Sequence, residues 1–216
     1  MPRVVAPGRS APSPVPPPTV LTRPDDEPTA ATLLAAAVEV MAVNGYHGSS
    51  VRDIASAAGT SPAVLYHHYA SKQGLLVTLC DRSLDLLLHA TEDALDDAGH
   101  EPAARLDAIV GAHVRFHMDS QRESLIGNSE LRALEPAGRA LVIAKRDAQQ
   151  RLFDRVVRDG TREGVFTTAH PRDAARFVVT ACTGVATWYR PGGALHPEQV
   201  VARHRAIALD AVGHRR

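Results

Sequence analysis

The stretch "SVRDIASAAGTSPAVLYHHYASKQGLL", residues 50–76, contains two short helical segments on either side of a glycine-containing turn. Its start matches the spacing of a capping box, with Asp53 in the place of the usual glutamate. We therefore expect one helix over residues 51–58 and a second over residues 62–68, with Ser61 as the N-cap of the second. Two short helices joined by about three residues form a helix-turn-helix, which predicts a small DNA-binding head.

The second of these helices has two different faces. Leu65 and Tyr69 lie four residues apart and form the side expected to face the core. The opposite side carries Pro62, Ala63, Tyr66 and His67. Small side chains at the N-terminal end let a recognition helix approach base edges closely, and the free N–H groups there favour a phosphate. This pattern favours a DNA-facing surface over a metal site or an acid/base site built from the neighbouring histidines.

The same stretch closely resembles the DNA-binding segment of the TetR family of transcriptional repressors. The shared features are a capped helix with Asp-Ile-Ala, then Ala-Gly, Ser, Leu-Tyr, His-aromatic, Ser-Lys and Leu-Leu. The resemblance extends over the helix expected at residues 29–44 as well. It implies a two-domain all-α fold, a homodimer, operator binding by the head and small-molecule binding by the body.

Carried over residue by residue, the resemblance assigns two groups of DNA contacts. The expected phosphate or backbone contacts are Ser50, Tyr66, His68 and Lys72, and the expected base-proximal residues are Thr60, Ser61, Pro62, Ala63 and His67. Each serine has an alternative role as a helix cap alone, which is worth about 1 kcal/mol. For His68, a phosphate contact and a core position both stay open.

The head is poor in charge for a DNA-binding protein. Residues 29–80 carry only Arg52 and Lys72 as permanent positive charges. Because each neutralised phosphate contributes a salt slope of about −0.9, we expect a slope smaller in magnitude than about 5 per dimer. Protonation of His67 and His68 would add charge, so we expect operator affinity to rise below about pH 6.5.

The rest of the chain also has a helical pattern, which predicts an all-α protein with two domains. Residues 1–28 are rich in proline and lack aromatic side chains, so we expect a disordered arm there. We expect a three-helix head over residues 29–72 and a larger helical ligand-binding and dimerisation domain over residues 73–216. Further helices are expected to begin at Pro102, near Pro136, at Pro171 and at Pro197, with Gly160 and Gly164 as breaks.

Composition excludes several classes of protein. The 216 residues are 44% hydrophobic and carry zero formal net charge, which argues against a general polyanion binder. Two cysteines, Cys80 and Cys182, indicate a reducing compartment without structural disulfides. No apolar run approaches the roughly 20 residues that span a bilayer, and the N-terminus lacks an apolar signal core. We expect a cytoplasmic protein that joins the nucleoid through its operator and has no membrane partner.

The body carries no catalytic motif, and we expect no cofactor and no metal. Its expected ligand pocket is formed by residues of the middle helices, with arginines as anchors for an anion: His113, Phe116, His117, Phe153, Trp188, Arg132 and Arg146. Plain core packing is the alternative for each of them. His113 and His117 also have the i, i+4 spacing of metal ligands, but a third ligand is not evident. A His-dependent metalloenzyme therefore stays the less favoured hypothesis.

The last two helices are the expected dimer contact. Along residues 171–190, one stripe holds Phe177, Ala181, Gly184, Val185 and Trp188, and a second holds Val178, Cys182 and Tyr189. A helix that is apolar on two sides is buried on two sides, so one side is expected to face a pocket and the other a partner subunit. The TetR resemblance places helices near 171–190 and 197–213 in a four-helix bundle between subunits. A short recognition helix also favours a twofold dimer, which reads a palindrome.

These features lead to one main functional hypothesis. A homodimer binds a palindromic double-stranded DNA operator as a repressor and is released by a small hydrophobic effector. The stretch "RESLIGNSELRALEP", residues 122–136, is similar to repressors that respond to acyl-CoA thioesters, which suggests such a thioester as the effector. An activator with the same head is the alternative, because the position of the operator relative to the promoter decides the sign of regulation.

Overall fold

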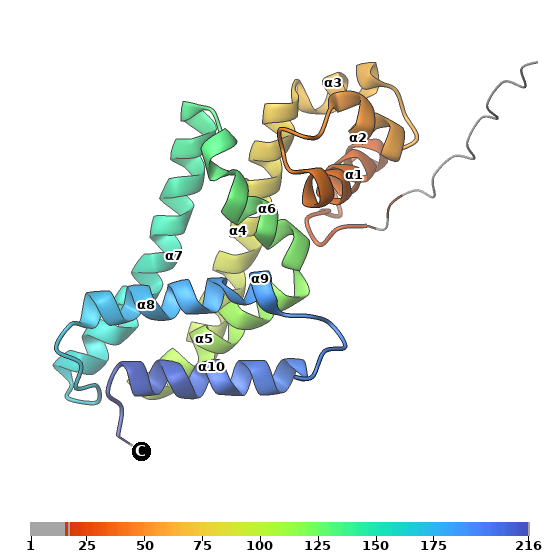
Figure 1. The fold of residues 1–216 in the computed structure, drawn as a ribbon. Coiled ribbons are helices and arrows are strands. Elements are labelled where there is room, and N and C mark those ends of the chain that lie inside the picture. The colour runs from red at the N-terminus through yellow and green to blue at the C-terminus, as the bar shows by residue number, and fades with distance from the viewer. Residues whose placement is uncertain (1–15, 17, 216) are drawn as a thin grey trace, which may run out of the picture.

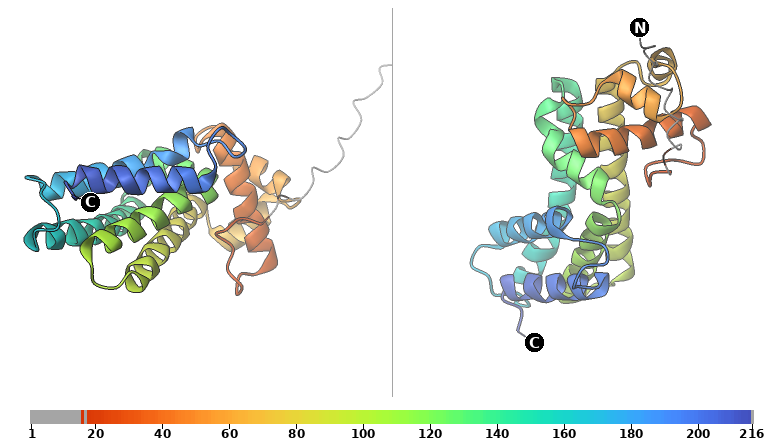
Figure 2. Two further views of the ribbon diagram at one scale, coloured as in Figure 1. Left: turned by 90° about the horizontal axis from the view of Figure 1, so that it is seen from below. Right: turned by 45° about the vertical axis from the view of Figure 1, so that its right-hand side comes forward.

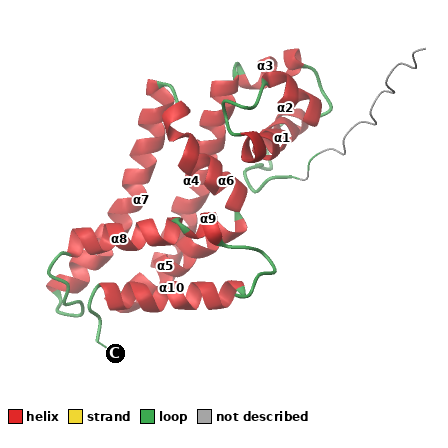
Figure 3. Ribbon diagram, viewed as in Figure 1, coloured by secondary structure: helices red, strands yellow, loops and turns green. Residues whose placement is uncertain are grey.

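The computed structural model describes residue 16 and residues 18–215, and these residues form helices and loops with no strand (Figure 3). This confirms the all-α expectation. In chain order the helices are α1 (Pro28–Asn44), α2 (Val51–Ala57), α3 (Pro62–Tyr69), α4 (Lys72–Asp97), α5 (Pro102–Asp119), α6 (Gln121–Ser129), the 3-10 turn η1 (Glu130–Ala133), α7 (Pro136–Arg162), α8 (Pro171–Thr183), α9 (Val185–Trp188) and α10 (Pro197–Ala211). The small head, α1 to α3, lies at one end of the molecule (Figure 1).

Two hydrophobic cores hold the chain together, and α4 takes part in both. The head core combines apolar side chains of α1, α2 and α3 with Leu76 and Leu79 of α4, Ile126 of α6 and Val142 of α7. The body core is built from α5, α7, α8 and α10 and includes Leu95 of α4. Figure 1 shows α4 running from the head down into the body. The expected domain boundary after residue 72 therefore falls within the packing of the head core.

The helices begin largely where their capping residues predict. Ser50 Oγ accepts a hydrogen bond from Asp53 N at 3.1 Å, and Asp53 Oδ2 accepts one from Ser50 N at 2.9 Å, which completes the expected capping box. Ser71 Oγ accepts from Gly74 N at 2.9 Å and starts α4. Ser61 is the N-cap residue of α3, as expected, although its side chain makes no capping hydrogen bond.

Gly160 does not break the chain as expected. It lies inside α7, which ends at Arg162, and Gly164 follows with a φ of 77° in the loop before α8. Gly160 is needed for close packing: a Cβ there would lie 2.3 Å from Phe166 Cε2 and 2.9 Å from Pro102 Cβ. The missing side chain thus lets the end of α7 approach the start of α5 and the loop after α7.

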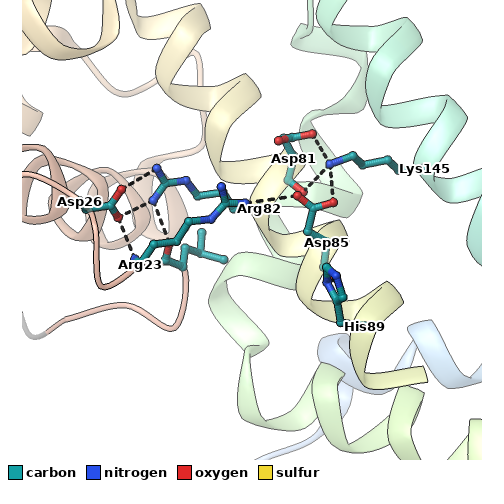
Figure 4. A network of polar contacts seen from close by, with 8 residues as sticks. Arg23, Asp26, Asp81, Arg82, Asp85, His89 and Lys145 are labelled. Carbon is teal, nitrogen blue, oxygen red and sulfur yellow. Dashed lines mark hydrogen bonds and ion pairs between the residues drawn. The ribbon is translucent and has the colours of Figure 1, made fainter. Parts of the chain in front are cut away.

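The segment before α1 is attached to the head core and to α4, which corrects the expectation of a disordered arm for residues 18–27. Leu21 is 1% exposed and belongs to the head core. Arg82 of α4 donates to Leu21 O at 3.1 Å and to Asp26 Oδ1 at 2.7 Å. Arg23 pairs with Asp85 of α4 at 3.3 Å (Figure 4). The disorder expected for residues 1–15 and 17 concerns positions outside the described residues.

The same network reaches α7. Lys145 Nζ pairs with Asp85 Oδ1 at 2.6 Å and also contacts Asp81, so α4 holds the N-terminal segment on one side and α7 on the other (Figure 4). Nearby carboxylates favour the charged amine, and the pKa of Lys145 is raised despite its partial burial. These ion pairs fix the relative positions of three segments that are distant in sequence.

Replacing Gly160 with alanine tests the packing at the end of α7. Overpacking of this kind costs typically about 1–3 kcal/mol, and the buried ring of Phe166 leaves little room for adjustment. We expect Gly160→Ala to lower the free energy of unfolding by that amount in a denaturant titration. Gly127→Ala is the matched control: a Cβ there meets nothing within 4 Å, so alanine should stabilise α6 by about 0.5–1 kcal/mol. Equal stability of the two variants would contradict the packing argument.

Candidate nucleic-acid interface and ligand cavity

The outer face of α3 presents the residues expected to contact DNA. Ser61, Pro62, Ala63 and His67 are exposed, and Tyr66 is 52% exposed. Leu65 on the opposite face is completely buried in the head core. Thr60, in the turn between α2 and α3, is partly exposed beside this face. The structure therefore brings the expected base-proximal residues together on one surface, with small side chains at the N-terminal end.

The two serines at the helix starts have different positions. Ser50 is exposed, but its hydroxyl is engaged in the capping box of α2. The Ser61 hydroxyl is exposed and caps nothing, so it is free to make a hydrogen bond to a partner molecule. Of the two, Ser61 is thus better placed as a DNA contact than as a structural cap.

Lys72 has a structural role that sequence reasoning did not foresee. Its Nζ donates to Tyr46 O and to Ser49 O, both at 2.8 Å, and lies 4.0 Å from the centroid of the Tyr46 ring. These contacts hold the loop between α1 and α2 against the start of α4. An ammonium group has three N–H donors, so one remains for the phosphate contact that the TetR resemblance predicts.

The two remaining aromatic positions of α3 face the first helix. Tyr69 donates a hydrogen bond from its hydroxyl to Ala30 O at 2.7 Å, and burial raises its pKa to about 12. Tyr69 is therefore a core residue, as expected. His68 is partly buried, with Nε2 lying 3.4 Å from Glu27 Oε2 at the start of α1. Its nearest charged partner is in its own chain, which favours the inward alternative for His68.

Salt titration of operator binding tests the expectation that protein cations neutralise only a few DNA phosphates. The permanent cations of residues 29–80 are Lys72, with one donor of its Nζ left over, and Arg52, which is exposed on α2. We expect a plot of log K against log[salt] with a slope smaller in magnitude than about 5 per dimer. A slope of roughly −10 would contradict this and point to arginines outside the head.

A small cavity lies in the body, between α4, α5, α6 and α7. Its volume is about 30 Å³, which is room for about two water-sized groups. Its wall is apolar where α4 and α7 supply Cys80, Leu84, Leu87 and Val142. The polar groups on it are Ser83, His117, Ser124, Asn128 and Arg146. Apolar walls with a few convergent polar groups resemble the lining of a ligand site, although this cavity is far smaller than the roughly 300–1,000 Å³ of a typical one.

Three of the seven residues expected to line a pocket do line this cavity: Phe116, His117 and Arg146. His113 and Phe153 instead belong to the buried interior, where their rings meet edge to face with centroids 5.4 Å apart. Arg132 is exposed on η1. Trp188 is 46% exposed on the outer side of α9 and stacks on His204 of α10. These four do not line the cavity.

Sequence reasoning missed the cavity residues of α6 because it did not separate α6 from α5. The break comes at Ser120, whose ψ of 46° ends α5 without a glycine or proline as a signal. Ser124 and Asn128 follow in α6 and face the cavity with Ser83 of α4. The one available sign was Ser124 directly before Leu125 and Ile126, at a helical position where a buried hydroxyl needs a partner.

The two histidines of α5 are held as neutral side chains by a buried hydrogen-bond chain. His113 Nε2 lies 3.0 Å from Thr183 Oγ1, and its Nδ1 lies 3.3 Å from Gln149 Nε2. Because the Gln149 amide nitrogen can only donate, Nδ1 of His113 is the acceptor and Nε2 carries the proton. His117 Nδ1 donates to His113 O at 2.9 Å, which leaves its Nε2 as an acceptor.

Burial also sets the pKa values of this pair. Burial lowers the pKa of His113 well below its usual value. Burial lowers the pKa of His117 to about 4, with the Arg146 charge adding to the effect. The rings stack with centroids 4.5 Å apart and an interplanar angle of 12°. No group of three metal-ligating side chains occurs in the part of the chain that the structure describes.

The pH dependence of stability tests this arrangement. An unfolded histidine binds a proton near pH 6.5, whereas folded His117 does so only near pH 4, so stability falls as pH drops from 6.5 to 4. His117 can account for about 3 kcal/mol of that loss. We expect His117→Asn to flatten the stability profile over this range in denaturant titrations. His89→Asn, at an exposed position of α4, should leave the profile unchanged. A profile of equal steepness in both variants would contradict the assignment.

Known protein families match both parts of this fold. The description "Bacterial regulatory proteins, tetR family" matches residues 33–79, and "Tetracyclin repressor-like, C-terminal domain" matches residues 99–212. The HTH-type transcriptional repressor KstR2 of Mycobacterium tuberculosis is 32% identical over 182 residues, which are 83% of this chain and 90% of that protein. The chain belongs to the TetR family. It is a DNA-binding transcriptional regulator, not an enzyme.

Solved structures of TetR-family regulators share the whole fold. A bacterial regulatory protein in the tetR family from Rhodococcus RHA1 matches with a TM-score of 0.84 and 29% identity over 88% of this chain and 100% of that one. AibR, solved with isovaleryl coenzyme A and operator DNA, matches with a TM-score of 0.78 and 21% identity over 87% of this chain and 100% of that one. No helix among the described residues of this TetR-family regulator is long and apolar enough to cross a membrane.

Proposed function

We propose that the chain is a repressor that binds a palindromic operator as a homodimer and is released when an acyl-CoA thioester enters its body. The observation that carries the proposal is the placement of the cavity. Its walls come partly from α4 and α6, and the same two helices supply side chains to the head core. A ligand that spreads these walls therefore acts directly on helices that contribute to the core of the head.

The outer faces of α8 and α10 support the proposed dimer. Phe177 is 60% exposed, Ile207 is 55% exposed and Trp188 is 46% exposed. The two helices contact each other and lie side by side on one outer surface of the body (Figure 2). Exposed Thr180, Ala181 and Ala202 leave room for close approach of another helix. A cluster of large apolar side chains on the surface of a soluble domain is typical of a protein interface.

The two apolar stripes expected along residues 171–190 are not divided between buried and exposed sides as predicted. Gly184 separates α8 from α9, so this segment is not one helix. Val178, Cys182 and Tyr189 are buried in the body core as expected, and Val185 joins them. Phe177 and Trp188 keep the outward side, which leaves that side free for the partner subunit in the proposed bundle.

Charge substitutions on this surface test the dimer. Placing a carboxylate in a buried apolar interface leaves it unpaired, which is strongly unfavourable. We expect Phe177→Asp combined with Ile207→Glu to yield monomers in sedimentation experiments and to weaken operator binding by about a hundredfold or more. Leu86→Glu, at a 38% exposed leucine of α4, should leave both properties unchanged. A double variant that stays dimeric would refute the proposed helices.

The proposed route from cavity to head runs through α6. Ser124 and Asn128 of α6 line the cavity, while Ile126 packs into the head core. Beyond them, Glu130 Oε1 accepts a hydrogen bond from Tyr46 N of the head at 3.2 Å. Arg122 pairs with Glu39 of α1. Movement of α6 thus changes contacts with α1 and with the loop that precedes α2.

The nature of the effector rests on likeness to known repressors. AibR is described in complex with isovaleryl coenzyme A, and residues 122–136 of this chain are similar to acyl-CoA-responsive repressors. The cavity of about 30 Å³ accommodates only one end of such a molecule. The rest of the thioester has to part the surrounding helices, which supplies the force that displaces the head.

The proposal is tested in two steps. An operator sequence is first selected, and the effect of thioesters on binding to that operator is then measured. Sequences enriched from random duplexes by the purified full chain should be palindromic, with half-sites about one helical turn or more apart. Isovaleryl-CoA, octanoyl-CoA, palmitoyl-CoA and suberoyl-CoA are then added to the complex, with free CoA as the control. At least one thioester should weaken operator binding by about tenfold or more, because allosteric coupling is commonly 1–3 kcal/mol. No palindrome, or no release by any thioester, would refute the proposal.

A further inference from the structure

Arg146 brings a positive charge to the cavity that no carboxylate of the described residues balances. Its Nη2 donates to Gly127 O at 2.6 Å and to Asn128 Oδ1 at 3.3 Å, and both acceptors are neutral. No ion pair within 4.0 Å involves this guanidinium in the described part of the chain, whereas the adjacent Lys145 has two carboxylate partners. Burial lowers the pKa of Arg146, which is the direction expected for a charge without an anionic neighbour.

The contacts of Arg146 account for only part of its hydrogen-bonding capacity. Gly127 and Asn128 lie in the last turn of α6, where a cation near the free carbonyl groups is favourable. This explains the position of Nη2. A guanidinium has five N–H donors, and those on Nε and Nη1 make no hydrogen bond to a described residue; neither atom is among the buried unsatisfied ones, so both reach solvent. Because Arg146 lines the cavity, these donors are available to a bound ligand.

Ser124 gives an independent sign that a ligand belongs here. It is 5% exposed, and its buried Oγ has no hydrogen-bond partner among the described residues. An unsatisfied buried hydroxyl costs about 1–3 kcal/mol. Ser124 lines the same small cavity as Arg146, from the neighbouring helix. Two donors from different helices thus converge on a space with room for about two water-sized groups.

One type of ligand group matches the size of the cavity and the donors of Arg146 and Ser124. A carboxylate accepts hydrogen bonds only, matches the planar edge of a guanidinium and fits a space of about 30 Å³. A phosphate is larger, and the adenosine end of coenzyme A is much larger. A simple alkyl end would leave both the arginine charge and the serine hydroxyl without partners. His117 Nε2, as a neutral acceptor, suits a water or a hydroxyl beside the carboxylate.

We propose that the effector carries a carboxylate at its buried end, held by the Arg146 guanidinium and the Ser124 hydroxyl. This inference rests on the proposed function. It narrows the effector from acyl-CoA thioesters in general to thioesters of dicarboxylic acids, with the thioester at one end and the free acid at the other. Arg146 and Ser124 are then the residues that distinguish such thioesters from ordinary fatty acyl thioesters.

A matched pair of probes tests the inference: octanoyl-CoA and suberoyl-CoA, which have the same chain length and differ in the terminal carboxylate. We expect suberoyl-CoA to bind the full chain about tenfold or more tightly than octanoyl-CoA in calorimetry, because charge-assisted hydrogen bonds are among the strong ones. Equal binding, or tighter binding of octanoyl-CoA, would overturn the inference and leave the proposed function standing. If neither thioester nor any other acyl-CoA binds, the proposed function itself fails.

Three variants test which side chains cause the preference for suberoyl-CoA over octanoyl-CoA. Arg146→Met should abolish the preference for suberoyl-CoA while keeping octanoyl-CoA binding. Ser124→Ala removes a hydroxyl that has no partner in the free protein, so it should fold normally and reduce the preference about threefold to tenfold. Arg132→Met, at the exposed arginine of η1, is the matched control and should keep the full preference. A preference that survives in Ser124→Ala and Arg146→Met alike would overturn the assignment.

Discussion

Helix α4 places its leucines in two separate hydrophobic cores, and the rest of the structure depends on this sharing. Leu76 and Leu79 lie in the core of the head, whereas Leu95 lies in the core of the body. The helix is long enough for both because its 26 residues extend about 39 Å at 1.5 Å per residue. A displacement of α4 within the body therefore has to be matched by movement of the head or by loss of buried contacts.

Charged contacts reinforce this apolar connection at the junction. Arg82 ties the segment before α1 to α4, and Lys145 ties α4 to α7 next to the arginine of the cavity. The head itself uses its scarce charge internally, since Lys72 holds the loop between α1 and α2. In the proposed function, recognition by the head depends on the shape and hydrogen bonding of α3 more than on net charge, and specificity depends on pairing two such heads correctly.

Local patterns in the sequence were enough to predict the head, and long-range packing explains what they missed. The capping box at Ser50 and the alternation of faces around Leu65 are encoded within a few residues, so the helix-turn-helix could be located directly. Leu21 was expected to lie in a disordered arm, because the head core into which it packs includes residues far along the chain. The sequence predicted a helix break at Gly160. The structure instead shows that the missing side chain makes room for the Phe166 ring, which no local pattern could indicate. The cavity combines four helices, so the sequence predicted only three of its lining residues: Phe116, His117 and Arg146.

In the proposed function, filling the cavity moves the two heads relative to each other. Val43 of α1 is 82% exposed, and both native cysteines are buried, so Val43→Cys offers a single site for a spin label on each head. The distance between the two labels in the dimer is then measured with and without saturating suberoyl-CoA or octanoyl-CoA. The account predicts that the bound thioester shifts the distance distribution. An unchanged distribution, in a sample where calorimetry shows the thioester bound, would contradict it.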